Sequence, residues 1–137
     1  MKITKFLKPS LITTDLPKKD KRGVLEFLVS VLVDQGEIPK EDAPEILTAL
    51  LEREALTSTG LGYGVALPHA KTDRVKKIVV AFGRNAKGLD FEALDGNPVH
   101  FFFLILAPTR STEEYLKTLS LISALLKDEK ARSRLAA

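Results

Sequence analysis

Apolar residues recur at helical spacing in two stretches of the first half of the chain. The first stretch begins after Asp20, whose side chain can cap a helix, and ends at Gly36, a residue suited to the position just past a helix. The second follows Pro39 and runs to about Arg53. The apolar positions of the two helices are Val24, Leu25, Leu28, Val31 and Leu32, then Ala43, Ile46, Leu47, Leu50 and Leu51. Each set forms one stripe, so we expect both helices to bury that stripe in a core.

A third helical pattern occupies the C-terminal part of the chain. Ser111 or Thr112 can cap this helix, with Glu114 as the partner in a capping box. A last short helix is expected to start near Asp128. The expected apolar face of the third helix consists of Leu116, Leu119, Ile122, Leu125 and Leu126.

The middle of the chain carries short apolar runs that are typical of β-strands. "KIVVAFG" at 77–83 is rich in β-branched residues, and "VHFFFLILA" at 99–107 is apolar on both faces, which indicates a central strand. Shorter strands are expected near Leu11–Thr14 and at Val65–Leu67. The segment "RNAKGLDF" at 84–91 is expected to turn.

Helices at both ends and strands in the middle predict a single α/β domain over residues 1–137. We expect a mixed sheet of four to five strands, sandwiched between helices. Apolar residues make up 45% of the chain and charged residues 28%, which is a soluble globular balance. The longest apolar run is far shorter than the roughly 20 residues that cross a bilayer, and the N-terminus lacks the apolar segment of a secretory signal. We therefore expect a cytoplasmic protein with no membrane segment of its own.

The net charge of +3 is mildly basic and changes this picture little. We interpret the basic clusters at 18–22 and 74–77 as solvated surface, because neither tyrosine lies in them and the chain has no tryptophan to stack on bases. The chain has no cysteine and only two histidines, which leaves little to bind a metal ion. We expect no nucleic acid partner and no metal.

The candidate chemistry lies in "STGLGYGVALPHAKTD" at 58–73. The imidazole of His69 has an ordinary pKa of about 6.5, so it is largely neutral near pH 7 and can act as a nucleophile, a proton shuttle or a metal ligand. A phosphate-carrying histidine would explain the glycines before it, whose backbone N–H groups can approach an anion, and Arg53, which can fold over the segment. These glycines are Gly60, Gly62 and Gly64. A surface histidine after a glycine-rich loop fits the same residues, so the pattern alone leaves both interpretations open.

The run "TSTGLGYGVALPHAKTDRVKK" resembles the phosphoacceptor segment of the type-2 EIIA domains of the phosphoenolpyruvate-dependent phosphotransferase system. These include the fructose and mannitol EIIA domains and the nitrogen-regulatory EIIA proteins, with a pattern close to "STG(I/L)G.G(I/V)A(I/V)PH". The resemblance continues through "RE" at 53–54, "LDGNPVHFFFLILAP" at 94–108 and "LKTLSLISALLKD" at 116–128. It covers the chain from about residue 10 onward.

The resemblance implies a histidine phosphocarrier. His69 would accept a phosphoryl group on Nε2 from the phosphocarrier protein HPr, and would pass it to an EIIB domain or use its phosphorylation state as a regulatory signal. Arg53 matches the arginine of the family and would stabilise the phosphoryl charge, and no cofactor is implied. The alternative is a regulatory interaction domain that binds protein partners without being phosphorylated, so whether the chain is an enzyme stays open.

The chain departs from the family's pattern in two respects. Many members have a second active-site histidine on the helix after the central strand, and Tyr115 occupies that position here. Its hydroxyl can donate a hydrogen bond but cannot become cationic, so Tyr115 either serves as a donor or only covers the edge of the site. Tyr63 and Ala70 stand where regulatory members often have Asn and Gly. His100, in the most apolar strand, is interpreted as a strand histidine with one satisfied ring nitrogen.

Overall fold

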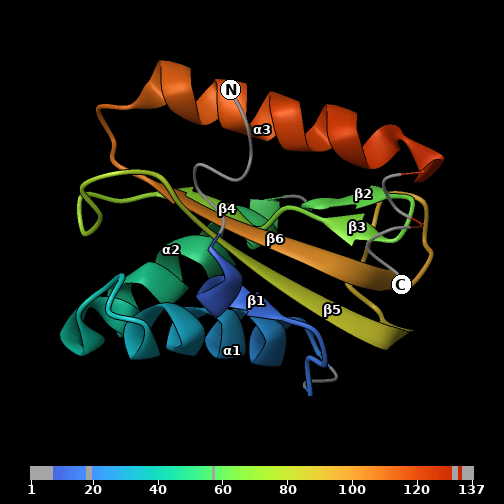
Figure 1. Ribbon diagram of the computed structural model, residues 1–137, viewed down its shortest axis with the longest axis horizontal. Coiled ribbons are helices and arrows are strands. Elements are labelled where there is room, and N and C mark those ends of the chain that lie inside the picture. Colours follow the sequence, from blue (N-terminus) through green and yellow to red (C-terminus); the bar gives the residue numbers. More distant parts are fainter. Residues whose placement is uncertain (1–7, 18–19, 57, 131–132, 134–137) are drawn as a thin grey trace.

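A mixed β-sheet forms the middle layer of the molecule, with helices on both of its faces. The computed structural model describes residues 8–17, 20–56, 58–130 and 133. Helices α1 (Lys21–Asp34) and α2 (Ala43–Leu56) lie on one face of the sheet, and α3 (Thr112–Lys127) lies on the other (Figure 1). The predicted α/β sandwich is therefore confirmed.

Within the described part of the chain the sheet has six strands, two of which share one position. The strands are β1 (Ile12–Thr13), β2 (Gly60–Gly62), β3 (Val65–Ala66), β4 (His69–Lys71), β5 (Val79–Leu89) and β6 (Val99–Ala107). Their order is β1-β5-β6-β3-β2, and β4 also pairs with β6. Both β3 and β4 run parallel to β6, whereas β5 runs antiparallel to it. The sheet thus has five positions, within the four to five strands that the sequence predicts, and β6 is its central strand.

Because β6 is central, its side chains enter two separate cores. Phe102, Leu104 and Leu106 belong to the core beneath α1 and α2. Phe101, Phe103 and Ile105 belong to the core beneath α3, together with the buried residues of that helix. A strand that is buried on both faces has to be largely apolar, which is why the run at 99–107, apolar except for His100, predicted it.

The first helix begins and ends where the sequence predicts. The carboxylate of Asp20 accepts a hydrogen bond of 2.6 Å from the backbone N–H of Gly23, which satisfies a free donor of the first turn. Gly36 follows the helix with φ 75°, a left-handed conformation that glycine adopts without strain. Short 3₁₀ turns at Pro9–Leu11 and Lys40–Asp42 precede β1 and α2.

The prediction of a turn at 84–91 is wrong, because β5 continues to Leu89. The turn-forming residues instead make a bulge inside the strand: the register against β6 shifts between Arg84 and Leu89. The side chain of Asn85 accepts hydrogen bonds from the N–H groups of Lys87 and Gly88, at 3.1 Å and 3.0 Å. Local turn chemistry is therefore present, but pairing with β6 carries the strand past it.

The face predicted for α3 is confirmed in part, since Ile122 and Leu126 are buried as expected, whereas two other predicted positions and the cap are corrected. Leu116 and Leu125 are 55% and 40% exposed. The residues that α3 buries are Tyr115, Thr118, Ile122 and Leu126. Thr118 tolerates burial because its hydroxyl donates to the carbonyl of Glu114 at 2.9 Å.

The capping box predicted at the start of α3 is absent. Ser111 is the N-cap, but its side chain makes no cap hydrogen bond. Its ψ of 39° departs from the extended conformation that such caps usually have. Of the last helix expected near Asp128, residues 129, 130 and 133 are helical, and the rest lies outside the described residues.

Candidate functional site

His69 is held by a hydrogen bond to its own chain. It is the first residue of β4, directly after the short break at Leu67 and Pro68 that separates β4 from β3. Its Nδ1 lies 2.7 Å from the carbonyl oxygen of Leu67. A carbonyl oxygen can only accept, so Nδ1 carries the proton and Nε2 keeps a free lone pair. The half-buried ring therefore presents a single nucleophilic nitrogen.

The surroundings of His69 favour its neutral form. Burial of the ring is the largest cause that lowers its pKa below the ordinary value, and the positive charge of Arg53 lowers it further. The hydrogen bond to Leu67 and the negative charge of Glu54 act in the opposite direction. The net shift of the pKa is downward, so the ring is unprotonated on Nε2 at neutral pH.

The structure brings Arg53 and Tyr115 to this ring. The centroid of the Tyr115 ring lies 5.8 Å from that of His69, with 58° between the two planes. Arg53, in the last turn of α2, acts electrostatically on both side chains. Burial raises the pKa of Tyr115 to about 12, so its hydroxyl stays protonated and remains a hydrogen-bond donor at neutral pH. Three residues that the sequence analysis singled out therefore meet, from α2, β4 and α3.

Lys71 adds a second cation beside the site. It follows His69 by two positions on β4, so the two side chains leave the same face of the strand. Its Nζ lies 5.6 Å from the centroid of the Tyr115 ring and donates to the hydroxyl of Thr112 at 2.9 Å. Lys71 was assigned no role in the sequence analysis. The available signal was the two-residue spacing, which becomes informative once 69–71 is known to be a strand.

The structure does not bring Gly62 and Gly64 to the histidine ring. Gly62 pairs with Val65, which lies opposite Phe101 of β6, whereas His69 lies opposite Ile105. Four residues along a strand separate these positions by about 13 Å. Gly60 lies nearer, opposite Ala66.

Backbone conformation or close packing explains why glycine occupies each of these three positions. Gly62 and Gly64 adopt φ values of 98° and 75°, in the left-handed region where other residues are strained. A Cβ added at Gly60 would lie 2.8 Å from the backbone and side chain of Ala93, so only glycine fits there. The glycines thus shape the β2–β3 hairpin and its packing, and a phosphate-binding role finds no support from the position of Gly62 or Gly64.

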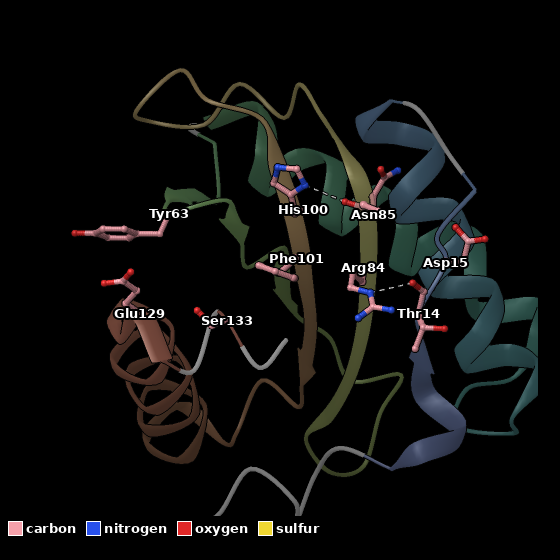
Figure 2. Close-up of a pocket in the computed structure, with 10 residues that line it drawn as sticks. Thr14, Asp15, Tyr63, Arg84, Asn85, His100, Phe101, Glu129 and Ser133 are labelled. Carbon is pink, nitrogen blue, oxygen red and sulfur yellow. Dashed lines mark hydrogen bonds between the residues drawn. The ribbon is translucent and has the colours of Figure 1, made fainter. Parts of the chain in front are cut away.

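A cavity of about 720 Å³ lies beside the start of β6, at His100 and Phe101 (Figure 2). His69 lies toward the other end of this strand, opposite Ile105. Tyr63, Arg84, Asn85 and His100 are among the residues that line it. The Nδ1 of His100 donates to the backbone carbonyl of Asn85 at 3.1 Å, so His100 is a strand histidine with one ring nitrogen bonded, as predicted. This cavity contains none of the residues that surround His69.

Two further features are absent among the described residues, a metal-binding cluster and a membrane-spanning helix. No group of three or more His, Asp or Glu side chains among them is arranged to hold a metal ion. No helix in that part of the chain is long and apolar enough to cross a membrane.

A neutral imidazole beside a guanidinium, on an α/β sandwich, is the arrangement expected of a domain that carries a phosphoryl group on histidine. The family described as "Phosphoenolpyruvate-dependent sugar phosphotransferase system, EIIA 2" matches residues 5–137, and the chain belongs to this family. The resemblance found in the sequence is therefore confirmed.

The relatives of the chain include sugar-specific and nitrogen-regulatory proteins. The fructose-specific EIIA component of Haloferax volcanii is 45% identical over 125 residues, which cover 91% of this chain and 80% of that protein. The crystal structure of the nitrogen regulatory protein IIA-Ntr from Neisseria meningitidis matches with a TM-score of 0.89 and 32% identity, over 98% of this chain and 90% of that one. Enzyme IIAMTL from Escherichia coli, solved in complex with phosphorylated enzyme IIBMTL, matches with a TM-score of 0.78 and 28% identity, over 96% and 90%.

Proposed function

We propose that this EIIA domain carries a phosphoryl group on Nε2 of His69, taken from HPr. The observation that carries the proposal is the hydrogen bond from Nδ1 to the carbonyl oxygen of Leu67, because it leaves Nε2 as the only ring nitrogen with a free lone pair. That lone pair attacks phosphorus, the bond between phosphorus and the donor breaks, and a P–Nε2 bond forms. Nδ1 keeps its proton throughout, so no general base is needed at this ring.

Charge compensation is the second requirement of phosphoryl transfer. The transition state is loose, so positioning and stabilisation of charge account for most of the catalysis. Arg53 supplies a guanidinium near His69, and the neutral hydroxyl of Tyr115 supplies a donor. At an effective dielectric constant of about 20, opposite charges about 4 Å apart attract by roughly 4 kcal/mol. Such an interaction is large enough to favour the phosphorylated form while still allowing the group to be passed on.

The phosphoryl group then goes to an EIIB domain or acts as a signal. The complex of the E. coli enzyme IIAMTL with phosphorylated IIBMTL supports an EIIB domain as the recipient. The likeness to the nitrogen regulatory protein from N. meningitidis supports the second output, in which a regulatory partner reads whether His69 is phosphorylated. Both outputs use the same chemistry at His69.

The test is reconstitution with phosphoenolpyruvate, enzyme I and HPr, followed by intact-mass measurement. The wild type is expected to gain one phosphoryl mass that is lost in acid and stable in base. His69→Ala is expected to gain none, because it lacks the nucleophile. His100→Ala is the matched control, since it removes the other histidine at the far end of β6, and it is expected to be phosphorylated like the wild type. Undiminished phosphorylation of His69→Ala would place the acceptor elsewhere.

A further inference from the structure

Glu54 is a buried carboxylate that the phosphotransfer chemistry above does not use. It lies on α2 directly after Arg53 and is only 6% exposed. A buried charge is strongly destabilising unless it is paired and hydrogen-bonded. Glu54 meets both conditions: it accepts hydrogen bonds from the backbone N–H of Thr59 at 3.2 Å and from the hydroxyl of Thr59, and Nζ of Lys21 lies 3.2 Å away.

Two further hydrogen bonds connect Thr59, and through it this carboxylate, to the ring of His69. The carbonyl of Thr59 accepts from the N–H of Leu67 at 3.0 Å. The carbonyl of Leu67 in turn accepts from Nδ1 of His69 at 2.7 Å. The chain of contacts thus runs from Glu54 through Thr59 and Leu67 to the nitrogen that fixes the tautomer of the ring.

We propose that Glu54 is a positioning residue for phosphotransfer, which acts on His69 through Thr59 and Leu67. The carboxylate holds Thr59 in place, Thr59 sets the position of the peptide at Leu67, and the Leu67 carbonyl then keeps the proton on Nδ1 and aims Nε2 outward. This inference rests on the proposed function, since it assigns the role of Glu54 to the same ring.

The position of Glu54 on α2 also couples it to Arg53, its neighbour on the same helical turn. Consecutive residues on a helix point about 100° apart, so the end of α2 directs Arg53 toward His69 and Tyr115 and buries Glu54 under the segment that follows. The guanidinium and the support of the imidazole are therefore fixed by one turn of one helix. The negative charge of Glu54 raises the pKa of His69, whereas the positive charge of Arg53 lowers it. Glu54 therefore offsets part of the effect of Arg53 on the ring.

The experiment compares Glu54→Ala with Glu52→Ala, an exposed glutamate on the same helix that serves as the matched control. Nitrogen-15 NMR of the unphosphorylated protein reports which ring nitrogen of His69 carries the proton. Single-turnover transfer from phosphorylated HPr reports the rate. Glu54→Ala is expected to show a mixture of tautomers and a transfer rate lowered by about tenfold or more, because a small misplacement of a reacting group is enough to cause such a loss. Glu52→Ala is expected to match the wild type in both measurements.

A second variant covers the case in which Glu54→Ala does not fold. Thr59→Val keeps the backbone N–H and the approximate volume of the side chain but removes the hydroxyl that donates to Glu54. It is expected to shift the tautomer and the rate in the same direction by a smaller amount. Wild-type tautomer and rate in folded Glu54→Ala, or in Thr59→Val where the alanine variant is unfolded, would overturn the positioning role.

The two proposals fail in different ways. If the wild type accepts no phosphate on His69, the proposed function fails. The tautomer measurement needs no phosphate, so it still decides whether Glu54 positions the ring. If the wild type is phosphorylated and Glu54→Ala behaves like it, the positioning role alone fails.

Discussion

The reactivity of His69 is a property of its neighbours as much as of its own ring. An isolated imidazole exchanges its proton between two nitrogens and is partly charged near neutral pH. Here the Leu67 carbonyl selects one tautomer, and burial together with the charge of Arg53 lowers the pKa of the ring. Both effects increase the fraction of molecules with a free lone pair on Nε2. The sequence shows the histidine and the arginine, while their combined effect depends on their being adjacent in space.

At the residue scale, Arg53→Ala is expected to alter the pH profile of phosphorylation as well as its rate. The cation of Arg53 disfavours the imidazolium, so removing it raises the pKa of His69. With a higher pKa, the imidazole of the variant becomes protonated, and therefore unreactive, at a higher pH than in the wild type. The acid limb of the rate profile consequently moves to higher pH. The loss of phosphoryl stabilisation lowers the rate at every pH by about 100-fold.

Stopped-flow or rapid-quench transfer from phosphorylated HPr between mildly acidic and neutral pH checks this expectation. The same donor is used for both proteins, so its own titration cancels in the comparison. Arg53→Lys is the control, because it keeps the positive charge and should leave the acid limb close to that of the wild type. An acid limb at the wild-type position in Arg53→Ala would show that the guanidinium does not act on the imidazole.

At the scale of the elements, α3 shows how an apolar pattern can define a helix without fixing its rotation. Ile122 and Leu126 of the predicted face are buried, yet Leu116 and Leu125 are exposed. The helix also buries Tyr115 and Thr118, which the apolar pattern did not include. Tyr115 packs against His69, and Thr118 satisfies its hydroxyl within the helix. Packing against the sheet therefore decides which side of this helix is buried.

This rotation of α3 predicts that truncating two of its aliphatic side chains lowers the free energy of unfolding by different amounts. Ile122→Ala is expected to lower the free energy of unfolding by about 2–5 kcal/mol, because it leaves a cavity in the core beneath α3. Leu116→Ala is expected to change the free energy of unfolding by no more than about 0.5 kcal/mol, because the side chain is largely in solvent. Urea denaturation followed by circular dichroism measures both. Equal losses for the two variants would contradict the described rotation.

For the molecule as a whole, the sheet divides the interior into two cores. One core joins α1 and α2 to one face of the sheet, and the other joins α3 to the opposite face (Figure 1). His69 lies where the two sides meet, because α2 brings Arg53 from one side and α3 brings Tyr115 from the other. The site therefore needs both layers of helices, even though most of its recognisable sequence is one short segment.

The division into two cores predicts that conservative truncations on opposite faces are additive. Ile46→Val on α2 and Ile122→Val on α3 are each expected to lower the free energy of unfolding by about 0.5–1.5 kcal/mol. The double variant is expected to lose the sum of the two, to within about 0.5 kcal/mol, because the side chains share no contact across the sheet. Chemical denaturation of the two single variants and the double variant tests this. A coupling energy above about 1 kcal/mol would show that the cores are not independent.

The sequence by itself determined the features that depend on residues close together in the chain. The cap at Asp20 and the helix end at Gly36 follow from local hydrogen bonding and backbone conformation, and the central strand follows from the run at 99–107, apolar except for His100. The segment around His69 is also contiguous, which is why the family could be identified from it. Such features need no knowledge of how distant segments meet.

Only the tertiary structure decided which distant residues share the site. The ion pair of Glu54 with Lys21, and the cation of Lys71 over the ring of Tyr115, join segments whose relative positions depend on strand register and helix rotation. The same register places Gly62 and Gly64 away from the ring, although they are near His69 in the sequence. The physical reason is that a strand separates sequence neighbours by about 3.3 Å per residue, whereas packing brings remote side chains into direct contact.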